Sequence, residues 1–381
     1  MRIVLFRSNP IDPDSRVEKE VESLTKHGFF VTLFVWDRSQ GGKRIVDFKR
    51  IGEFNVKRIR IMARAKYGAG LKSFFPFLKF QLSIFFWVIF HKKEFDVCHF
   101  CDFDTAMLGR IATRIARKPY VFDIFDYMST NPNSFLKRMV KRMEDKTINR
   151  ASATIICSDQ RIQQIKGTNP KKVVVVHNSP KMPDSFNNVI KTKTNKIKIV
   201  YVGILDEKQR MIKEIVNIVE RTNNLELHIG GFGPLESFVL ERAKISNNIL
   251  FYGKLSYLDT LSLERECDII TAIYNPNVAN SIFAAPNKFY EALMLGKPTI
   301  MIKGTGMSDV VEREQIGVVT SCDEESIERG IKELISKKPE WEKIRYKENE
   351  LYTNMFSWTE MERRLVLLYR EIEEKSIEGA N

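Results

Sequence analysis

Long hydrophobic runs are missing from this 381-residue chain. Its most apolar stretch, FFPFLKFQLSIFFWVIF at residues 74–90, is interrupted by Pro76, Lys79 and Gln81. The uninterrupted apolar part, residues 84–90, is far shorter than the roughly 20 residues that span a bilayer. The sequence therefore predicts no transmembrane helix. The opening residues MRIVLF predict a strand rather than a targeting segment.

Cysteines are few, and their number is odd. The five lie at Cys98, Cys101, Cys157, Cys267 and Cys322. A scattered odd set without a signal peptide indicates a reducing compartment, so we expect a cytoplasmic protein. The stretch CHFC at 98–101 has metal-ligand residue types, but it alternates like a buried strand and no second ligand pair occurs elsewhere. We therefore predict no metal site.

Acidic residues are scarce in the first half of the chain. Residues 1–190 carry 34 Lys and Arg against 18 Asp and Glu, a net charge of +16, whereas the remainder has a net charge of −3. Within residues 38–93 there are 14 basic side chains and two acidic ones, Asp47 and Glu53. A one-sided basic field attracts an anionic surface, either a membrane leaflet or nucleic acid.

Residues 74–90 have two interpretations. A basic–aromatic helix, flanked by Lys72 and His91, can lie in a membrane interface on the cytoplasmic face, and a helix of the same composition can pack against a sheet as core. On the first interpretation the predicted membrane or acceptor contacts are Phe85, Phe86, Trp87, Lys92 and Lys93. We expect no nucleic-acid partner, because the basic region lacks a recognised binding module and its aromatic residues cluster instead of interleaving with the basic ones.

Strand and helix patterns alternate along the whole chain. In the first half, strands are predicted at 2–6, 30–36, 95–100, 120–125, 153–158 and 172–178, with helices such as 105–117 and 134–150 between them. The first predicted helix starts at a capping box formed by Ser15 and Glu18 and ends at Gly28. Repeated strand–helix units predict a parallel, doubly wound sheet with right-handed crossovers.

A polar stretch, PKMPDSFNNVIKTKTN at 180–195, interrupts this alternation and resembles an interdomain linker. The alternation then restarts. Strands are predicted at 196–203, 225–230, 249–253, 268–274, 298–304 and 317–321, with helices at 208–222, 235–245, 256–266, 324–337 and 356–375. We predict an α/β protein with Rossmann-like domains at 1–182 and 196–355, a linker at 183–195 and a C-terminal helical segment at 356–381. Ligands of such sheets bind at the carboxyl ends of the strands, so we expect a shared ligand in a cleft between two domains.

Glycines end three predicted strands of the second domain. Gly203, Gly231, Gly233 and Gly253 lie at these ends, where glycine lets the backbone approach a ligand closely. Glycines at such positions also serve simply to turn the chain. Three such strand ends in one sheet favour a ligand-facing edge.

The stretch APNKFYEALMLGKPTI at 285–300 adds polar groups to that domain. Pro286 suits the first turn of a helix, the amide of Asn287 follows it, and exposed N–H groups at a helix start bind anions. Lys288 and Glu291 share one face of the helix, and Arg210 is a second candidate cation. A cation beside a carboxylate suits a phosphate beside a pair of sugar hydroxyls, whereas the simpler interpretation is an ordinary helix with surface charges.

Ordered motifs across nearly the whole chain resemble GT-B glycosyltransferases, especially glycosyltransferase family 4. The matching segments are DSRVEKEVESLTKHGFFVTLFVW, YVGILDEKQRMIKEIV, LELHIGGFGPLES, ILFYGKL, APNKFYEALMLGKPTI, IGVVTSCDEESIERGIKEL and FSWTEMERRLVLLY. The resemblance implies two Rossmann-like domains facing a cleft, with the nucleoside-diphosphate sugar on the C-terminal domain and the acceptor on the N-terminal one. It also implies a last helix that crosses back onto the first domain, and no cofactor beyond the sugar nucleotide.

The resemblance assigns roles by position. Glu291 corresponds to the glutamate that grips the ribose, Lys288 and Arg210 to the cations on the diphosphate, and Gly231 and Gly233 to the turn beside the nucleotide. Two positions depart from the family pattern. Phe283 stands where a glutamate often contacts the donor sugar, and Ile204 stands where an arginine often follows the first glycine.

A third departure concerns the reacting group. The family often carries a histidine in a D-x-H-D stretch of the first domain, and here Phe125 stands in its place, between Asp123 and Asp126. A carboxylate can accept the proton of an acceptor hydroxyl, so Asp126 is the first candidate base and Asp123 the second. Both can instead simply cap the following turn. Asp102 and Asp104, after the preceding strand, are weaker candidates. His177 and Asn178, at a strand end near the linker, are expected either to border the cleft or simply to form a turn.

Two functions follow from these observations. The leading one is a glycosyltransferase that moves a sugar from a nucleoside-diphosphate sugar to a lipid-linked or membrane-proximal glycan acceptor. It is expected to need no metal, because cations and a helix start can stabilise the leaving diphosphate, and the resemblance favours retention of configuration. The alternative is a non-catalytic GT-B-like protein that binds a membrane or polyanionic partner, and donor hydrolysis discriminates between the two.

Overall fold

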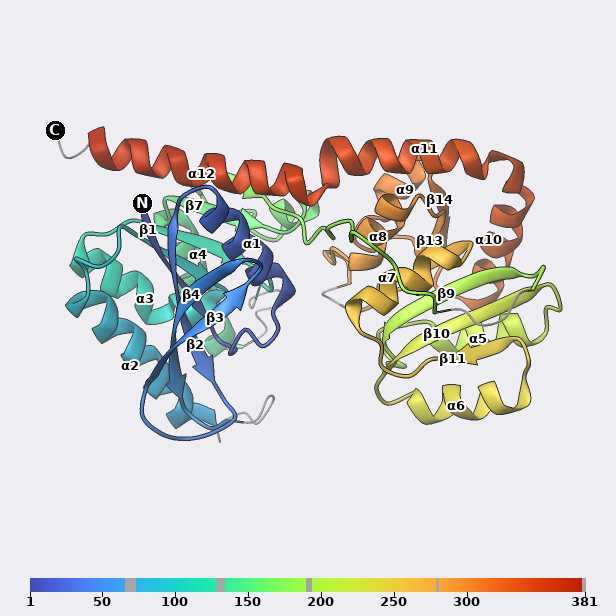
Figure 1. The fold of residues 1–381 in the computed structure, drawn as a ribbon, viewed down its shortest axis with the longest axis horizontal. Coiled ribbons are helices and arrows are strands. Elements are labelled where there is room, and N and C mark those ends of the chain that lie inside the picture. The colour runs from blue at the N-terminus through green and yellow to red at the C-terminus, as the bar shows by residue number, and fades with distance from the viewer. Residues whose placement is uncertain (66–72, 128–133, 190–193, 279–280, 379–381) are drawn as a thin grey trace. The chain divides into compact units, whose positions relative to one another are not determined.

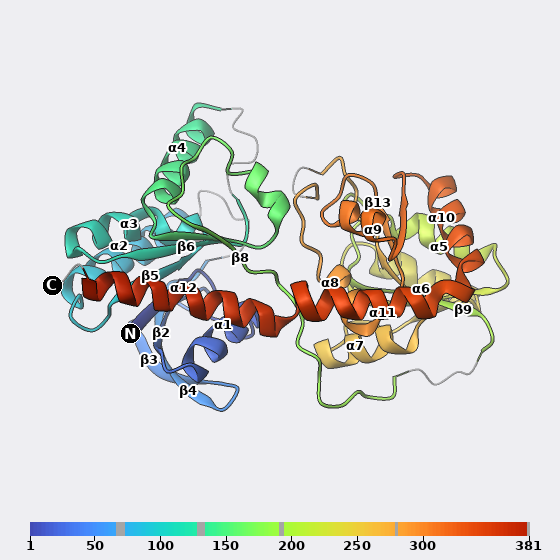
Figure 2. The ribbon, with the colours of Figure 1, turned by 90° about the horizontal axis from the view of Figure 1, so that it is seen from above.

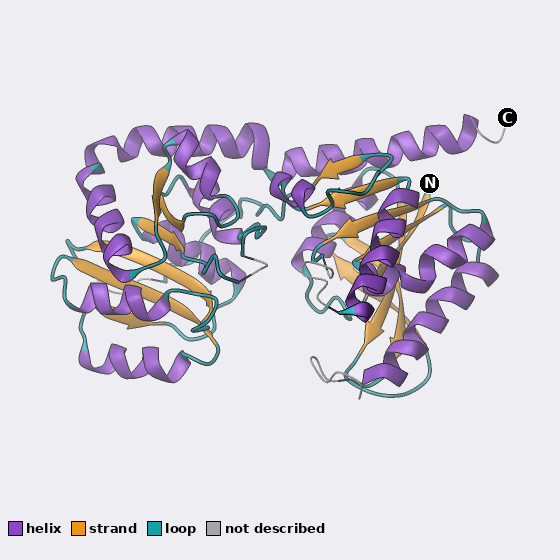
Figure 3. Cartoon of the chain, turned by 180° about the vertical axis from the view of Figure 1, so that it is seen from behind, coloured by secondary structure: helices purple, strands orange, loops and turns teal. Residues whose placement is uncertain are grey.

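The computed structural model describes residues 1–65, 73–127, 134–189, 194–278 and 281–378. The chain divides into two compact units, the first formed by Met1–His177 with Met361–Asn381 and the second by Asn178–Glu360. Each unit has one sheet with helices on both faces (Figure 1, Figure 3). The prediction of an α/β fold with two Rossmann-like sheets is confirmed. The predicted linker, residues 183–195, falls within the sequence of the second unit.

The first unit is built on an eight-stranded sheet with the order β3-β4-β2-β1-β5-β6-β7-β8. Its elements are β1 (Arg2–Arg7), α1 (Ser15–Lys26), β2 (Phe30–Asp37), β3 (Ile45–Ile51), β4 (Phe54–Met62), α2 (Phe74–Phe90), β5 (Val97–Cys101), α3 (Phe103–Ala116), β6 (Tyr120–Ile124), α4 (Phe135–Arg150), β7 (Ala153–Ile156), β8 (Val173–Val175) and α12 (Trp358–Glu378). Neighbouring strands pair in parallel except β3, which is antiparallel to β4. Alternate residues of a strand face opposite sides, so Val4 and Phe6 of β1 join the core under α2 and α3 while Ile3 and Leu5 are buried on the other face.

The start of α1 differs from the sequence prediction. Asp14, not Ser15, is the residue that caps the helix, because its carboxylate accepts a hydrogen bond from the backbone N–H of Val17. Ser15 is the first helical residue. The capping-box prediction is therefore wrong by one residue.

The hairpin β3–β4 was not predicted, and it changes the interpretation of the basic segment. Arg58 on β4 donates to both Asp47 and Asp12, at 2.9 and 2.8 Å, and Arg60 pairs with Asp37. These ion pairs neutralise part of the excess charge counted over residues 38–93. The basic field is thus smaller in the folded protein than in the sequence.

Helix α2 has both a buried and an exposed side. Trp87 is buried, and its ring packs against Phe34 and Phe95 and stacks on His91. Trp87 is therefore not an exposed surface residue: the sheet covers most of its ring, and it is accessible only as part of the lining of a groove beside α2. Phe86 remains 49% exposed. Within the described residues, every helix is too short or too polar to cross a membrane.

Phe85, Lys92 and Lys93 were also predicted to contact a membrane or acceptor. Phe85 lies on α2, and the two lysines lie just after it. Phe85 is partly buried and packs against the core of the first unit, whereas Lys92 and Lys93, which follow the helix, are exposed. Phe86, Lys92 and Lys93 therefore offer surface that a partner could contact.

Helix α12 returns to the first unit, as the resemblance implied. Met361, Leu365 and Tyr369 are buried, and the Tyr369 hydroxyl lies 2.6 Å from Nδ1 of His99 on β5. Because His99 also faces α1, the helices α1 and α12 cover the same face of the sheet (Figure 2).

The second unit is built on a six-stranded parallel sheet with the order β11-β10-β9-β12-β13-β14. Its elements are β9 (Ile197–Ile204), α5 (Ile212–Glu220), β10 (Leu225–Phe232), α6 (Glu236–Ile245), β11 (Ile249–Phe251), α7 (Tyr257–Glu266), β12 (Ile269–Ala272), α8 (Asn287–Leu295), β13 (Thr299–Ile302), α9 (Ser308–Glu314), β14 (Gly317–Thr320), α10 (Glu324–Ser336) and α11 (Trp341–Leu351). Helices α5 and α10 pack on one face, while α7 and α8 pack on the other. Helix α5 is shorter than predicted, which leaves Arg210 in the loop between β9 and α5.

His177 makes the stability of the first unit depend on pH. Its imidazole is buried beside the Cys157 carbonyl oxygen, 3.1 Å from Nδ1, and burial lowers the pKa of His177 to about 3. The unfolded chain therefore binds a proton below pH ~6.5 that the folded chain does not bind until about pH 3, so stability falls as pH decreases through this window.

We predict that the free energy of unfolding falls by about 2 kcal/mol between pH 7 and pH 5 through His177 alone. The substitution His177→Gln should remove that share of the pH dependence, measured by urea unfolding at both pH values. A control substitution at the partly exposed His91, His91→Gln, should leave it in place. Equal pH dependence in wild type and His177→Gln would contradict the assignment.

Candidate active site

Glycines at the carboxyl ends of the strands lie together in the second unit. Gly203 of β9 is paired in register with Gly231 of β10, and the N–H of Gly231 donates to the carbonyl oxygen of Gly253 at 2.7 Å. Gly231 has φ +138°, and a Cβ there would lie 1.8 Å from the Gly203 oxygen. Gly233 has φ +140°, and its Cβ would lie 2.7 Å from the Leu205 oxygen. The chain therefore requires glycine at 231 and 233 for its own close backbone contacts.

Two cations predicted to bind a diphosphate meet at the ring of Tyr201. The ammonium of Lys288 lies 4.7 Å from the centre of that ring, and a Cβ at Gly203 would come within 3.0 Å of it. Burial raises the pKa of Tyr201, while the charges of Lys288 and Arg210 oppose the rise. The guanidinium of Arg210 stacks 3.8 Å above the ring of Tyr274. Both cations thus lie beside the end of β9.

Lys288 is a buried cation with no direct anionic partner among the residues that the structure describes. Only 8% of the residue is exposed, and no described carboxylate lies within ion-pair distance of its ammonium. Burial alone would lower the pKa of Lys288, but Tyr274, Tyr201 and the more distant Glu291 raise it, so the side chain stays charged. An ammonium held this way lacks a matching negative charge, which a bound anion would supply.

Glu291 lies on the same face of α8 and is 3% exposed. Burial raises the pKa of Glu264 well above its ordinary value, and the charge of Glu291 and a side-chain hydrogen bond between the two residues add to the rise. The hydroxyl of Tyr257 also interacts with Glu291. Burial is the main cause that raises the pKa of Tyr257, and the charge of Glu291 raises it further. Sequence analysis missed Glu264 and Tyr257, because both lie on α7 and no spacing rule links them to α8.

The start of α8 differs in one detail from the prediction. Pro286 is the capping residue, with extended backbone at φ −68° and ψ 131°, and the helix begins at Asn287. Within the described residues no side chain caps this helix start. The side-chain oxygen of Asn287 accepts a hydrogen bond from Asn178 at 3.0 Å.

In the first unit, the predicted candidate base Asp123 is fully buried. Its carboxylate accepts hydrogen bonds from Arg16 at 2.9 and 3.2 Å, and His99 Nε2 lies 3.4 Å away. Despite burial, the charges of Arg16 and His99 lower the pKa of Asp123. A buried, strongly held carboxylate of low pKa is a poor general base, which weighs against Asp123 as the base.

Glu20, His99 and Asp123 form a group of metal-ligand residue types. Their ligand atoms lie within 4.8 Å of one another in the described chain. Arg16 already donates to both carboxylates, at 2.9 Å in each case, and supplies positive charge where an ion would sit. The donor set therefore fits an ion-pair network better than a metal.

Asp126 and Asp102 lie at the edge where β5 and β6 end. The side chain of Asp126 is 79% exposed, with Arg161 3.7 Å away. One Asp102 carboxylate oxygen accepts the backbone N–H groups of Phe125 and Asp126, at 2.8 and 2.9 Å. Its other oxygen accepts from Arg7 at 2.7 Å. The two aspartates are thus linked through one hydrogen bond.

Asp102 has the properties of an acid–base group more clearly than its sequence position suggested. Burial, opposed by Arg7 and aided by Asp104, raises the pKa of Asp102 to about 7. Its backbone has φ +66°, a region that non-glycine residues rarely adopt. Strain and a pKa near neutrality are common at reacting groups. Asp104, by contrast, lies in the first turn of α3, and burial raises its pKa as well.

Phe125, at the position of the family's histidine, is held between two cations. The guanidinium carbons of Arg7 and Arg16 each lie 4.3 Å from the centre of its ring. The ring therefore occupies the histidine position without offering a proton acceptor.

Comparisons with known proteins agree with this geometry. Residues 13–179 match the model of the "Glycosyl transferase 4-like domain", and residues 196–337 match that of "Glycosyl transferases group 1". Protein CapJ of Staphylococcus aureus is 27% identical over 228 residues, which cover 55% of this chain and 56% of CapJ. The match thus spans only about half the length of this curated relative.

Two solved structures share the fold over nearly the whole chain. Sucrose-phosphate synthase from Thermosynechococcus elongatus has a TM-score of 0.77 at 16% identity, covering 98% of this chain and 100% of that one. HepE of Anabaena, solved with UDP, has a TM-score of 0.65 at 16% identity, covering 97% and 100%. The two matched domains and the shared fold show that the chain belongs to the GT-B glycosyltransferases, with a family-4-like first domain and a group 1 second domain.

Proposed function

We propose that the chain transfers a sugar from a UDP-sugar to a lipid-linked or membrane-proximal glycan acceptor, without a metal ion and with retention of configuration. The observation that carries the donor half is the buried ammonium of Lys288, which has no anionic partner among the described residues. HepE, which shares the fold, has been solved with UDP and with UDP-glucose, and this supports uridine as the base. The family-4 resemblance supports retention.

The roles of the second-unit residues follow from their chemistry. Lys288 and Arg210 neutralise the diphosphate as it leaves, and the uncapped start of α8 adds N–H groups to the same task. Glu291 accepts hydrogen bonds from the paired ribose hydroxyls, while the side chain of Glu264, hydrogen-bonded to Glu291, holds that carboxylate in place. With two cations and a helix start, the leaving group is stabilised by the protein itself.

The first unit supplies the acceptor side. Asp126 is the predicted base because its carboxylate is exposed at the strand edge. Asp102, one hydrogen bond away, is the competing candidate because its pKa of about 7 lies near the working pH of a general base. Asp123 orients this edge through Arg16.

The exposed basic and aromatic residues of α2 and its end support membrane association. Phe86, Lys92 and Lys93 lie at the surface, where an anionic leaflet attracts lysines and accepts aromatic rings. A peripheral protein on the cytoplasmic face would meet a lipid-linked acceptor there.

We predict that Arg210→Ala and Glu291→Gln each weaken UDP binding about 10- to 100-fold, because each removes or weakens a hydrogen bond in which at least one partner is charged. Isothermal titration of the full chain with UDP measures the effect. Lys213→Ala is the matched control, since Lys213 is a nearby basic residue that pairs with Glu207. It should change the affinity less than twofold.

Two results would overturn the donor assignment. UDP binding that is unchanged in both variants would remove Arg210 and Glu291 from the site. An absence of binding to any nucleoside diphosphate or sugar nucleotide, with no donor hydrolysis, would favour the non-catalytic protein that binds a membrane or polyanion.

We predict that Asp126→Asn lowers turnover about 10²- to 10⁴-fold, the usual contribution of a general base, and changes UDP affinity little. Release of UDP from the sugar nucleotide measures turnover. A base must be deprotonated, so if Asp102 is the base, wild-type turnover declines as pH falls below about 7 and Asp102→Asn abolishes that decline. Unchanged turnover in Asp126→Asn removes Asp126 from the mechanism.

A further inference from the structure

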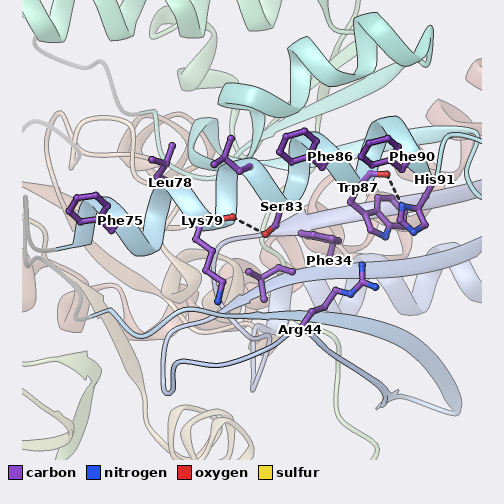
Figure 4. Close-up of a pocket in the computed structure, with 12 residues that line it drawn as sticks. Phe34, Arg44, Phe75, Leu78, Lys79, Ser83, Phe86, Trp87, Phe90 and His91 are labelled. Carbon is purple, nitrogen blue, oxygen red and sulfur yellow. Dashed lines mark hydrogen bonds between the residues drawn. The ribbon is translucent and has the colours of Figure 1, made fainter.

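An apolar groove runs along α2 in the first unit. It has a volume of about 650 Å³ and is lined mainly by Phe34 of β2, Ile61 of β4 and the α2 residues Leu82, Phe86, Trp87 and Phe90. Figure 4 shows the α2 side chains in a row with Phe34 and Arg44 across from them. The volume is in the range of small-molecule sites.

The groove has a buried floor and an exposed rim. Phe34 and Trp87 are buried, whereas Phe90 is 75% exposed and stacks on the half-exposed Phe86 at 6.1 Å. Phe75, at the other end, is also exposed. Apolar side chains left in water along one face mark a binding surface, since burying them is favourable.

The length of the groove suits one hydrocarbon chain. Phe75 and Phe90 lie at its two ends, and their separation on α2 corresponds to about 22 Å at 1.5 Å per residue. One leaflet of a bilayer has a hydrocarbon thickness of about 15 Å. A single lipid chain therefore fits along α2.

The polar atoms of the lining indicate a ligand without hydrogen-bonding groups along its length. The ammonium of Lys79 donates to the carbonyl oxygens of Gly42 and Met62, and the Ser83 hydroxyl donates to the Lys79 carbonyl oxygen, all at 2.8 Å. An extended peptide laid here would leave its own N–H and C=O groups unpaired, which is costly. A hydrocarbon chain has no such groups.

The positive charge around the groove favours a ligand with an anionic head group. No acidic side chain occurs among the twelve described residues of the lining, and Arg44 is exposed with no partner in the described parts of the chain. Lys92 and Lys93 lie just past the Phe90 end of α2. A phosphate attached to the hydrocarbon chain would therefore meet cations.

We propose that this groove binds one hydrocarbon chain of an anionic, phosphate-bearing membrane lipid, with Arg44 on the phosphate. The inference rests on the proposed function, because it supplies the contact by which the first unit reaches a lipid-linked acceptor. It is more specific than general membrane attraction, since it requires binding of a single lipid molecule. The donor residues of the second unit take no part in it.

Dodecyl phosphate below its micelle concentration is the probe, and dodecyl maltoside is the uncharged comparison. We expect saturable binding of monomeric dodecyl phosphate to the full chain, with a bromine-labelled analogue quenching the fluorescence of Trp87. Leu82→Glu, in the groove, should weaken binding at least tenfold, while Ile115→Glu, on the exposed face of α3, should leave it unchanged. Arg44→Ala should remove the preference for phosphate over maltoside, and Lys43→Ala should not.

Several results would overturn the proposal. Vesicle binding without any binding of monomeric lipid would mean a flat interfacial contact. A dimer that Leu82→Glu dissociates, seen by sedimentation, would mean that a second copy covers the groove. Equal effects of Leu82→Glu and Ile115→Glu would mean simple charge repulsion.

Two controls keep the test decisive. Ser83→Phe fills the groove without adding charge, and it replaces Leu82→Glu if that variant does not fold. UDP titration of each variant reports on the second unit separately. Lipid binding with no UDP binding would refute the proposed function and leave the groove intact, and the reverse result would refute the groove alone.

Discussion

In the first unit, the guanidinium of Arg16 donates to Glu20 and to Asp123, both fully buried, and His99 lies between Asp123 and the hydroxyl of Tyr369. Four elements, α1, β5, β6 and α12, each contribute to this network. Burial and the charge of Asp123 raise the pKa of Glu20 to about 7, while Arg16 opposes the rise. Because removal of one partner leaves a buried charge uncompensated, at a cost of about 3–5 kcal/mol, the four elements are tied together. Tyr369 joins the C-terminal helix to the network through its hydrogen bond with His99, and the buried Met361 and Leu365 add to the packing of that helix.

The network also accounts for the chemistry at the edge of the first sheet. Arg16 bonds Asp123 on one side and stacks on Phe125 on the other, and Arg7 stacks on the same ring while pairing with Asp102. The aromatic ring that replaces the family's histidine is thus held by two cations whose charges are already balanced by buried carboxylates. The ring offers no proton acceptor at this edge, and the carboxylates there are those of Asp102 and Asp126.

Much of the fold could be predicted from local pattern. Strand–helix alternation, strand-end glycines and the start of α8 depend on residues close in sequence, so they were recognisable. The hairpin β3–β4 was missed because its residues alternate without a continuous apolar face, and β3 is an edge strand with exposed Val46 and Phe48. The candidate site was harder to predict from the sequence than the fold. Arg16, which neutralises Asp123, lies 107 residues earlier in the sequence, and Glu264 contacts Glu291 from another helix. Neither contact can be recognised from the spacing of residues in the sequence. Likewise, the sequence does not show that Trp87 is buried while the neighbouring Phe86 is exposed; only the packed structure shows this difference.

The second unit holds Lys288 in an arrangement that is unfavourable without a ligand. A buried ammonium near aromatic rings has lost most of its water and gains only part of that energy back from Tyr201 and Tyr274. Glu291 is the nearest charged carboxylate on the same helix, yet it is directed to Glu264 and Tyr257. In the proposed function a diphosphate would supply the missing negative charge, and its binding would return free energy that the unliganded protein lacks. Separating the cation from the carboxylate on one helix face would then cost the free protein stability and leave two adjoining subsites, one for phosphate and one for hydroxyls.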